Sequence, residues 1–433
     1  MHHSVPVHNK TVKQLTKLRN KKGAGFQAHR AFQQKKADAQ DPADQEGWFR
    51  SMHTVFEEID VTFRFLNPAT PQRFLDLGCC PGGFASYILS RYPKTSGVGI
   101  SLPIEHGGHA FLLEDYLRPR FEIIWGDFTK YQLGPMFMDD PTLEMLPAIV
   151  GQPLPLPFSL GSIAPERFDV IIVDGHPLRG LDSNGGKRVG ETSQSAEFYT
   201  MGDQIFISQL ITALQAVLTS FSSLPNFSST SSSSVNAQGP TVVMKLSKPE
   251  RLITAQVMYM FDVLSASVGT WKPIHMHATR STFYLIAMGV GRSLRYQPVF
   301  IAGPAPCGRP GSASSPLTSP SPPSQPSPRE FPPILAMQAI RHYLDSLRCL
   351  WFSLKYGGSS QTPRSEASGS DIGSPVHSHL GSPRRLQPGD LNFIVSEDVI
   401  VNEYRPRLEQ LSRHVWEVEK ASLSGWYKTE GFS

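Results

Sequence analysis

The sequence predicts an α/β fold in which a doubly wound, mostly parallel sheet is covered by helices. Three observations support this prediction. Short apolar, β-branched runs of strand length recur between residues 74 and 290 and alternate with segments of helical periodicity. A glycine-rich turn follows the first of these runs. The chain has 433 residues, enough for one domain of about 250 residues with appended segments.

The first predicted strand and its turn lie at residues 74–86. Phe74 to Leu77 has the character of a short buried strand, and residues 84–89 have the apolar spacing of a helix that packs back on it. The glycines between them permit backbone conformations that a Cβ forbids. A strand, a glycine turn and a helix N-terminus together form a nucleotide-sized pocket, because free N–H groups point into it.

The pattern within this turn indicates which nucleotide is bound. Neither G-x-x-x-x-G-K-[ST] nor G-x-G-x-x-G is present. Residues 76–84 read D-L-G-C-C-P-G-G-F, which resembles the first motif of S-adenosylmethionine (SAM) methyltransferases and, more narrowly, the FtsJ-like family of RNA ribose 2′-O-methyltransferases. The resemblance implies a Rossmann-like methyltransferase domain with SAM as its cofactor and RNA as its substrate. The alternative is an ordinary strand, turn and helix whose glycines serve only tight packing.

Residues on either side of this motif extend the pattern. Apolar residues recur at intervals of three and four over residues 46–66, which predicts a helix before the first strand. Residues 96–103 predict a second strand that ends near Ser101, where many SAM enzymes carry an acid for the ribose hydroxyls. Residues 121–129 predict a third strand and a turn containing Asp127. The resemblance places this carboxylate beside the adenine, and an Asx-turn is the alternative.

The second half of the predicted sheet supplies two charged residues. Residues 168–173 predict a central strand that delivers Asp174 at its carboxyl end, the edge at which ligands bind in open α/β sheets. A strand at 241–246 carries Lys245. A lysine is costly to bury unpaired, so we expect it to emerge into a polar pocket.

Helices and two further strands complete the predicted domain. Helical periodicity over about 199–221 predicts one helix before the strand that contains Lys245, and periodicity over 250–267 predicts another after it. Residues 275–289 predict a closing pair of strands, of which the last covers 280–287.

Methylation of a ribose hydroxyl requires the oxygen to be aligned with the methyl donor and its proton to be removed during attack. The FtsJ-like family uses a Lys-Asp-Lys-Glu tetrad for this purpose. The resemblance implies that Asp174 and Lys245 are its second and third members, with Lys245 as the base and Asp174 as its orienting partner.

The two outer members of the tetrad depart from the family pattern. The helix that precedes the first motif contains no lysine; Glu57 or Glu58 stands at the expected spacing. We expect Arg50 to take the place of the first lysine. Because a guanidinium cannot cycle its proton, Arg50 could only position phosphate or ribose. Thr282 replaces the glutamate. These departures leave open a catalytically degenerate protein that binds SAM and RNA as a partner or scaffold. A third alternative keeps SAM but changes the acceptor to a protein or small molecule.

The predicted site therefore has two sets of residues. The catalytic set is Lys245, Asp174 and Arg50. The set predicted to bind SAM is Asp76, Gly78, Cys80, Pro81, Gly82, Gly83, Phe84, Ser101, Asp127 and Asp174. The spacing of the four cysteines is not that of a zinc site, so no metal is expected. The expected partner is RNA, without distinction between ribosomal RNA, transfer RNA and the messenger RNA cap.

Positive charge is concentrated at the N-terminus. Residues 1–37 contain nine Lys or Arg and no acid, whereas the rest of the chain has a net charge of −5. A tail of this kind is attracted to a phosphate backbone without reading sequence. A nuclear import signal and a merely solvated tail are the alternatives.

Composition divides the chain into four parts. They are a basic, disordered tail at 1–46, a methyltransferase domain at 47–300 with insertions at 134–166 and 222–239, a Pro/Ser-rich linker at 301–333, and helical segments at 334–433 around a disordered loop at 357–390. The C-terminal helices are expected to dock on the domain or on a protein partner.

The same composition bears on the compartment. No disulfide framework is evident, no signal peptide core is present at the N-terminus, and no apolar run reaches the roughly 18 residues of a membrane span. We therefore expect an intracellular protein of the nucleus or cytoplasm, with the mitochondrion as a third compartment, that does not associate with membranes.

Overall fold

The computed structural model describes residues 4–7, 9–20, 41–131, 167–176, 194–222, 239–292, 294–295, 333–357 and 383–429. The predicted insertions at 134–166 and 222–239 and the predicted linker at 301–333 lie almost entirely outside the described residues. The division of the chain into domains therefore stays a prediction.

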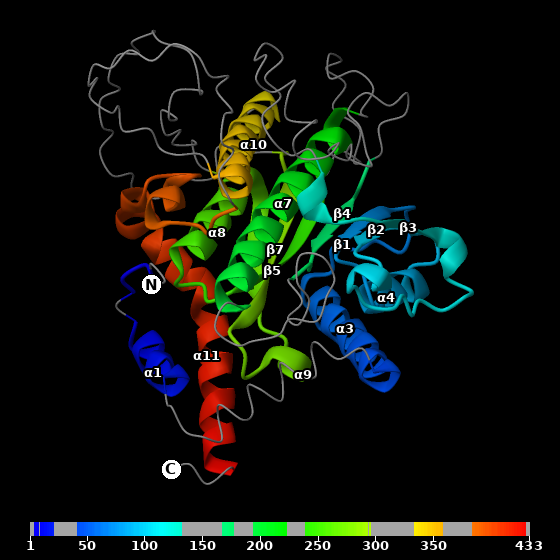
Figure 1. Cartoon of the computed structure of the whole chain (residues 1–433), viewed down its shortest axis with the longest axis horizontal. Helices are drawn as coiled ribbons and strands as arrows, with labels where there is room; N and C mark the ends of the chain where they lie inside the picture. Colours follow the sequence, from blue (N-terminus) through cyan, green and yellow to red (C-terminus); the bar gives the residue numbers. More distant parts are fainter. Residues whose placement is uncertain are drawn as a thin grey trace, which may run out of the picture.

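A seven-stranded sheet forms the centre of the molecule, in the order β3-β2-β1-β4-β5-β7-β6 (Figure 1). The first five strands are parallel, and β7 runs antiparallel to both β5 and β6. The chain moves outward in one direction from β1 and in the other from β4, so the carboxyl ends of these two strands flank a topological switch point. The strands are β1 Arg73–Leu77, β2 Ser96–Ser101, β3 Phe121–Trp125, β4 Val170–Val173, β5 Thr241–Ser247, β6 Ser265–Trp271 and β7 Thr282–Val290.

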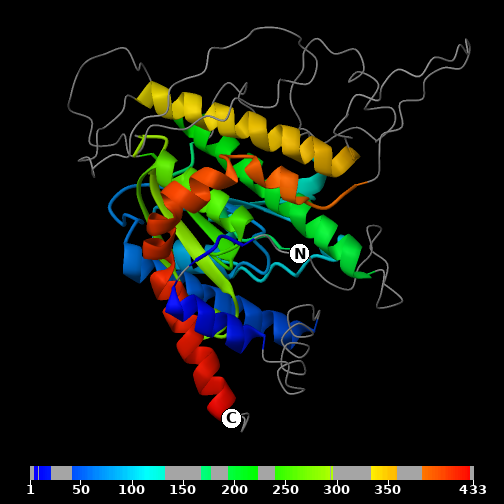
Figure 2. The ribbon, with the colours of Figure 1, turned by 90° about the vertical axis from the view of Figure 1, so that its left-hand side faces the viewer.

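Helices cover both faces of the sheet. Helices α3 and α4 lie on one face, while α7 and α8 lie on the other with α10 packed over α7 (Figures 1 and 2). The helices are α1 Lys10–Arg19, α3 Pro42–Phe63, α4 Gly83–Arg91, α7 Gln194–Ser222, α8 Leu252–Leu264, α9 Ile274–His277, α10 Pro333–Tyr356 and α11 Arg405–Thr429. Shorter helical turns lie at Ile104–His106, Arg118–Arg120, Phe128–Lys130 and Pro388–Asn392, and a π-helix lies at Val399–Tyr404. This arrangement confirms the predicted α/β fold class.

Alternate residues of each strand supply two separate cores, because successive side chains of a strand point to opposite faces of the sheet. Leu75, Ile171 and Val242 belong to the core beneath α7 and α8. Their neighbours Phe74, Ile172 and Val243 belong to the core beneath α3 and α4. The strands are thus apolar on both faces, as the near-continuous apolar runs of the sequence require.

Helix α7 is the most apolar long helix in the described part of the chain. Its segment Tyr199–Phe221 is long and apolar enough to cross a membrane, but 83% of the most apolar window is buried inside the protein. Helix α10 lies along it (Figure 2), and the Trp351 indole donates a hydrogen bond to Ser208 Oγ at 3.0 Å. We conclude that α7 is a core helix.

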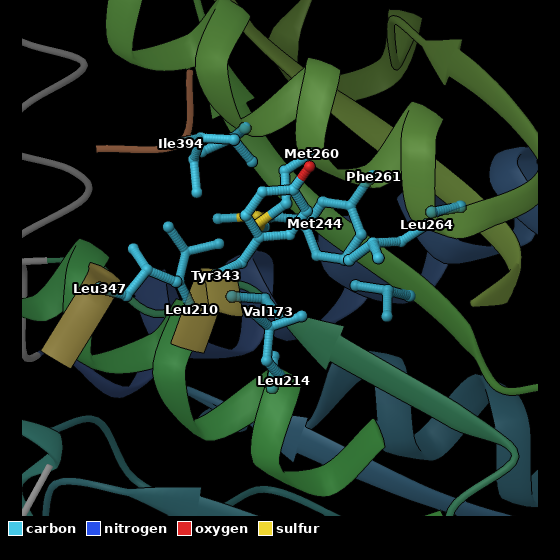
Figure 3. Packing of buried hydrophobic residues seen from close by; sticks show 14 of the residues in the cluster. Val173, Leu210, Leu214, Met244, Met260, Phe261, Leu264, Tyr343, Leu347 and Ile394 are labelled. Atoms are coloured by element: carbon cyan, nitrogen blue, oxygen red, sulfur yellow. The ribbon is translucent and has the colours of Figure 1, made fainter. Parts of the chain in front are cut away.

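The C-terminal segments complete the core on the α7 and α8 face. Tyr343 and Leu347 of α10, together with Ile394, point into the same cluster as Leu210 and Met260 (Figure 3). The sequence left open whether the C-terminal helices dock on the domain or on a protein partner. The structure shows them docked on the domain. The segment between 357 and 390 was expected to be disordered, yet residues 383–390 are placed, with the Arg384 guanidinium donating to both carboxylate oxygens of Asp390.

Two other expectations from the sequence were wrong in their boundaries. The helix predicted at 250–267 ends at Leu264, because Ser265 is extended and begins β6. The closing pair of strands was predicted within 275–289, but its first member is β6, and residues 274–277 form α9 instead. Short polar and β-branched residues in β6 carry little apolar periodicity, so this edge strand was not recognised.

The basic tail predicted at 1–46 contains an ordered helix. Asn9 caps α1 by accepting a hydrogen bond from the Thr11 N–H at 2.8 Å, and Val12 and Leu15 pack against Trp416 and Leu423 of α11. The tail was expected to be disordered because its charge pattern hides this short apolar stripe. Residues 42–46 also belong to a helix, since α3 begins at Pro42.

A buried ionic cluster joins α1 to the rest of the protein. The Arg19 guanidinium donates to both carboxylate oxygens of Glu419 at 2.7 Å and is also paired with Glu250. Lys272, which is fully buried, lies 3.7 Å from the Glu419 carboxylate and donates to the backbone carbonyl of Thr282 at 2.7 Å. The cluster therefore fixes the turn that leads into β7.

Replacing Leu347 with Ala should lower the free energy of unfolding by about 2–5 kcal/mol, since the side chain is fully buried against α7. Urea unfolding followed by circular dichroism measures this change. Gln338→Ala, on the exposed face of the same helix, is the matched control and should change stability by less than about 0.5 kcal/mol. Equal effects of the two substitutions would contradict the docking of α10 on the domain.

Replacing Arg19 with Ala should destabilise the protein by about 3–5 kcal/mol, because it leaves the buried Glu419 carboxylate without its bidentate partner. Lys13→Ala on the exposed side of α1 serves as the control. If unfolding shows no difference between the two variants, α1 does not bind to α11 in solution.

Candidate active site

The candidate site occupies the carboxyl edge of the central strands on the α3 and α4 face. Asp76, Asp174 and Lys245 each follow by two residues a core residue of that face, namely Phe74, Ile172 and Val243. Tyr284 precedes the core residue Ile286 by two. Because side chains repeat with a period of two along a strand, the fold brings all four polar side chains to one face at one edge.

Asp174 and Lys245 are in direct contact. Lys245 Nζ lies 2.9 Å from Asp174 Oδ1 and donates to the Asp174 backbone carbonyl at 2.5 Å. The Tyr284 hydroxyl donates to the same Oδ1 at 3.0 Å. Lys245 and Tyr284 are direct cross-strand partners in the β5–β7 ladder, which explains why both reach one carboxylate.

Burial affects the protonation of this group. Desolvation raises the pKa of Asp174, and the hydrogen bonds and charge of Lys245 and the hydrogen bond of Tyr284 act against that rise. Burial, followed by the charge of Asp174, raises the pKa of Tyr284 well above its usual range. Tyr284 therefore stays protonated and remains a donor to Asp174.

The glycine turn packs against the loop that follows β4. Gly78 has φ +88°, and a Cβ on it would lie 2.5 Å from the Gly175 Cα. The backbone N–H groups of both Asp174 and Gly175 donate to the Leu77 carbonyl at 3.0 Å. Gln209 of α7 holds Gly175 from the other side through its N–H and its carbonyl. Glycine at 78 therefore permits the carboxyl ends of β1 and β4 to meet.

The rest of the turn leads into α4 as predicted. Gly82 has φ +107° and is the N-cap of α4, which begins at Gly83, and Phe84 belongs to the core beneath α3. Pro81 follows a cis peptide bond after Cys80. The orphan N–H groups at this helix N-terminus are the feature that the sequence assigned to ligand binding.

Asp76 is the residue at this edge of the sheet whose surroundings point most directly to a ligand. It is 1% exposed, and neither of its carboxylate oxygens has a hydrogen-bond partner. Burial, then the charge of Asp174, raises the pKa of Asp76 well above its usual range. A buried carboxylate without donors is costly, and a cationic or hydroxyl-bearing ligand would relieve that cost. SAM carries both an ammonium group and ribose hydroxyls, so the residues present fit this cofactor.

Two further members of the predicted cofactor set interact with each other. A hydrogen bond from the neighbouring Cys79 lowers the pKa of the Cys80 thiol, and a hydrogen bond with Ser101 acts in the same direction. Ser101 is buried at the end of β2, where its carbonyl accepts the Gly126 N–H at 2.9 Å. The side chain that replaces an acid at this strand end is therefore turned toward the glycine loop.

Asp127 forms the Asx-turn considered as an alternative. Its Oδ1 accepts hydrogen bonds from the Thr129 N–H at 2.9 Å and from the Thr129 hydroxyl at 2.7 Å. Lys355 at the end of α10 donates to the Thr129 carbonyl at 2.8 Å. The turn is thus held by a helix outside the predicted methyltransferase domain. A role of Asp127 beside adenine stays a prediction.

No hydrogen bond or ion pair among the described residues joins either substitute for an outer tetrad member to the Asp174–Lys245 pair. The Arg50 guanidinium pairs with Glu46 on the surface of α3, where its side chain is 66% exposed. Glu58 accepts the Trp271 indole N–H and the N–H groups that begin α9. Thr282 is the first residue of β7, opposite Ser247. Arg50 is therefore not a third member of the buried pair, and its contact with RNA stays a prediction.

Sequence reasoning left three residues near this pair without a role. Tyr284 lies directly opposite Lys245 in the antiparallel β5–β7 ladder, a register that local periodicity does not reveal. His176 follows Asp174 closely and its Nδ1 lies 3.2 Å from Lys245 Nζ. His277 is buried against the Tyr284 ring, with neither ring nitrogen bonded. No group of three or more potential metal ligands occurs among the described residues.

The fold and the site together define a class of enzyme. The strand order, with an antiparallel β7 between β5 and β6, is typical of SAM-dependent methyltransferases. The sequence matches the profile of the FtsJ-like methyltransferase family over residues 56–290, more than half of the chain. The chain therefore belongs to the FtsJ-like methyltransferase family.

Similar solved structures include a protein described as a ribosomal RNA methyltransferase from Plasmodium falciparum. It is 17% identical, with coverage of 55% of this chain and 96% of that chain and a TM-score of 0.28. Human methyltransferase-like protein 13, in complex with S-adenosylhomocysteine, is 10% identical, with coverage of 54% and 80% and a TM-score of 0.28. No curated protein matches the sequence.

Replacing Asp76 with Asn should separate cofactor binding from stability. The raised pKa means that the folded chain binds the Asp76 proton more tightly than the unfolded chain. Stability from this group therefore falls as pH rises from about 3.8 through the raised folded value. At pH 7.5 the variant should unfold at the same or higher urea concentration than the wild type. Its SAM affinity, measured by calorimetry, should fall about 10- to 100-fold.

The control for this experiment is Asp115→Asn, which removes a carboxylate that is 94% exposed. It should leave both the SAM affinity and the pH dependence of unfolding unchanged. Wild-type SAM affinity in the Asp76 variant would show that this carboxylate does not contact the cofactor.

Proposed function

We propose that this chain transfers a methyl group from SAM to a ribose 2′-hydroxyl of RNA, with Lys245 as the base. The observation that carries the proposal is the contact of Lys245 with Asp174 beside the glycine turn, at the switch point of the sheet. The family assignment supports SAM as the methyl donor. Asp76, Gly78, Gly82 and Ser101 line the turn that would hold it.

The chemistry requires a fixed amine close to the acceptor oxygen. SAM supplies an electrophilic methyl group at this edge of the sheet when bound. The neutral amine of Lys245 takes the hydroxyl proton as the oxygen attacks. Asp174, which accepts a hydrogen bond from Tyr284, holds the amine in place and stabilises the ammonium that forms. Positioning of this kind contributes a large part of the rate in two-substrate transfers.

Exposed positive charge supports RNA as the acceptor. Lys10, Lys13 and Lys17 lie on the exposed side of α1. Arg50 presents an exposed guanidinium from α3. Such groups bind phosphate without base specificity, so they would position RNA rather than read its sequence.

The missing outer tetrad members favour a second candidate function. Neither Arg50 nor Thr282 interacts with the Asp174–Lys245 pair in the described structure. The chain would then bind SAM and RNA as a scaffold without catalysing transfer. A protein or small-molecule acceptor is the third candidate. It would use the same amine and carboxylate.

Replacing Lys245 with Ala should abolish methyl transfer while SAM binding persists, because the amine acts on the acceptor and not on the cofactor. The assay follows labelled methyl from SAM into a pool of unmodified ribosomal, transfer and capped messenger RNA transcripts. Alkaline hydrolysis of the product detects 2′-O-methylation, since a methylated ribose resists cleavage. We expect a loss of at least 10²-fold.

The control is Lys248→Ala, a lysine three residues further along the chain, which should retain activity. Transfer that survives in the Lys245 variant would overturn the role of the amine. SAM binding by the wild type without transfer to any transcript would favour the scaffold. Transfer to protein in a cell extract, with none to RNA, would support the third candidate.

A further inference from the structure

Lys245 has three acceptors around its Nζ atom. They are Asp174 Oδ1 at 2.9 Å, the Asp174 backbone carbonyl at 2.5 Å and His176 Nδ1 at 3.2 Å. An ammonium group has three hydrogens and no lone pair, so this set of acceptors matches the protonated amine. The site is therefore built around the form that Lys245 has after it takes a proton. A base must lose that proton before it can act again.

The surroundings of the amine differ in their access to solvent. Asp174 is 4% exposed and Tyr284 is fully buried, so neither gives a direct route to water. The Lys245 side chain is 19% exposed. His176, in contrast, is exposed and lies beyond the buried pair. It is the one exposed residue in the described structure that offers Lys245 Nζ an acceptor.

We propose that His176 accepts the proton from Lys245 after methyl transfer and passes it to solvent. This inference rests on the proposed function, because it requires Lys245 to be the base. It assigns a role to a residue that lies outside the family tetrad and was not identified from the sequence.

The proton transfers balance in three steps. The hydroxyl O–H bond breaks as the new O–CH₃ bond forms, and the proton moves to the Lys245 amine. The ammonium then gives a proton to His176 Nδ1, while the proton on Nε2 leaves to water. Tautomer exchange through solvent returns the ring to its starting form, and Lys245 is neutral for the next acceptor. No oxidant, reductant or metal is required.

Electrostatic interactions keep the His176 imidazole neutral, so that it is able to accept a proton. The positive charge of Lys245, followed by desolvation of the ring, lowers the pKa of His176 well below its usual range, and His109 and Arg280 act in the same direction. The imidazole is therefore neutral at physiological pH. In the tautomer that carries its hydrogen at Nε2, the lone pair at Nδ1 faces the Lys245 ammonium, and Nδ1 also lies 3.5 Å from the Asp174 backbone carbonyl. When Lys245 gives up its proton, the main charge that opposes protonation of the ring is removed. The two groups thus share one proton.

A purely structural role for His176 would need only an acceptor at the Nδ1 position. His176→Asn keeps such an acceptor, in its amide oxygen, but cannot take up a proton. His176→Ala leaves space that added imidazole can enter. His275→Asn changes an exposed histidine of α9 and is the matched control. Together these variants separate proton transfer from positioning.

The experiment measures multiple-turnover methyl transfer from labelled SAM to the same transcript pool, with SAM affinity measured in parallel. We expect His176→Asn and His176→Ala to lose about 10²-fold in rate with unchanged SAM affinity. Imidazole in solution should restore part of the rate of His176→Ala and none of the rate of His176→Asn. The control should match the wild type.

Each other outcome is decisive. A wild-type rate in His176→Asn overturns the relay while leaving the base intact, provided that Lys245→Ala is inactive. Loss in His176→Ala that imidazole does not restore, with full activity in His176→Asn, reduces His176 to a positioning residue. Absence of transfer by the wild type overturns the proposed function and, with it, the relay.

Discussion

The contact between Lys245 and Asp174 is the interaction on which the proposed chemistry depends. A lysine at the end of a central strand must meet an acceptor, and a carboxylate at the end of the neighbouring strand must meet a donor. The parallel pairing of β4 with β5 places both at the same edge. Tyr284 and Gly78 then complete the arrangement, one by donating to the carboxylate and the other by allowing β1 to approach.

The segments outside the family region support this edge from the opposite side. Helix α10 buries the apolar face of α7, whose Gln209 holds the loop after Asp174. Helix α11 contributes Glu419 to the buried cluster with Lys272, which fixes the turn before β7. Both contacts connect the C-terminal part of the chain to residues that position the site. The C-terminal helices therefore support the position of the site residues through these contacts with the domain.

Local patterns in the sequence predicted the fold class and placed Asp174 at the ligand-binding edge of the sheet, and the resemblance to the FtsJ-like family implied its pairing with Lys245. Buried parallel strands give apolar runs, and their carboxyl ends meet at one edge. The role of Tyr284 depends on an antiparallel register, and that of His176 on the path of a loop, so neither is visible in local periodicity. Strand β6 was missed for a similar reason. The apolar stripe of α1 was hidden by its charges, and only packing against Trp416 reveals it.

A structure of the chain with SAM bound tests the central claim most directly. We expect the cofactor over residues 78–83, with its methyl group about 6 Å from Lys245 Nζ, which leaves room for one hydroxyl oxygen between them. Asp76 should accept a hydrogen bond from the cofactor. A cofactor bound elsewhere, or with its methyl group directed away from Lys245 and Asp174, would contradict the account.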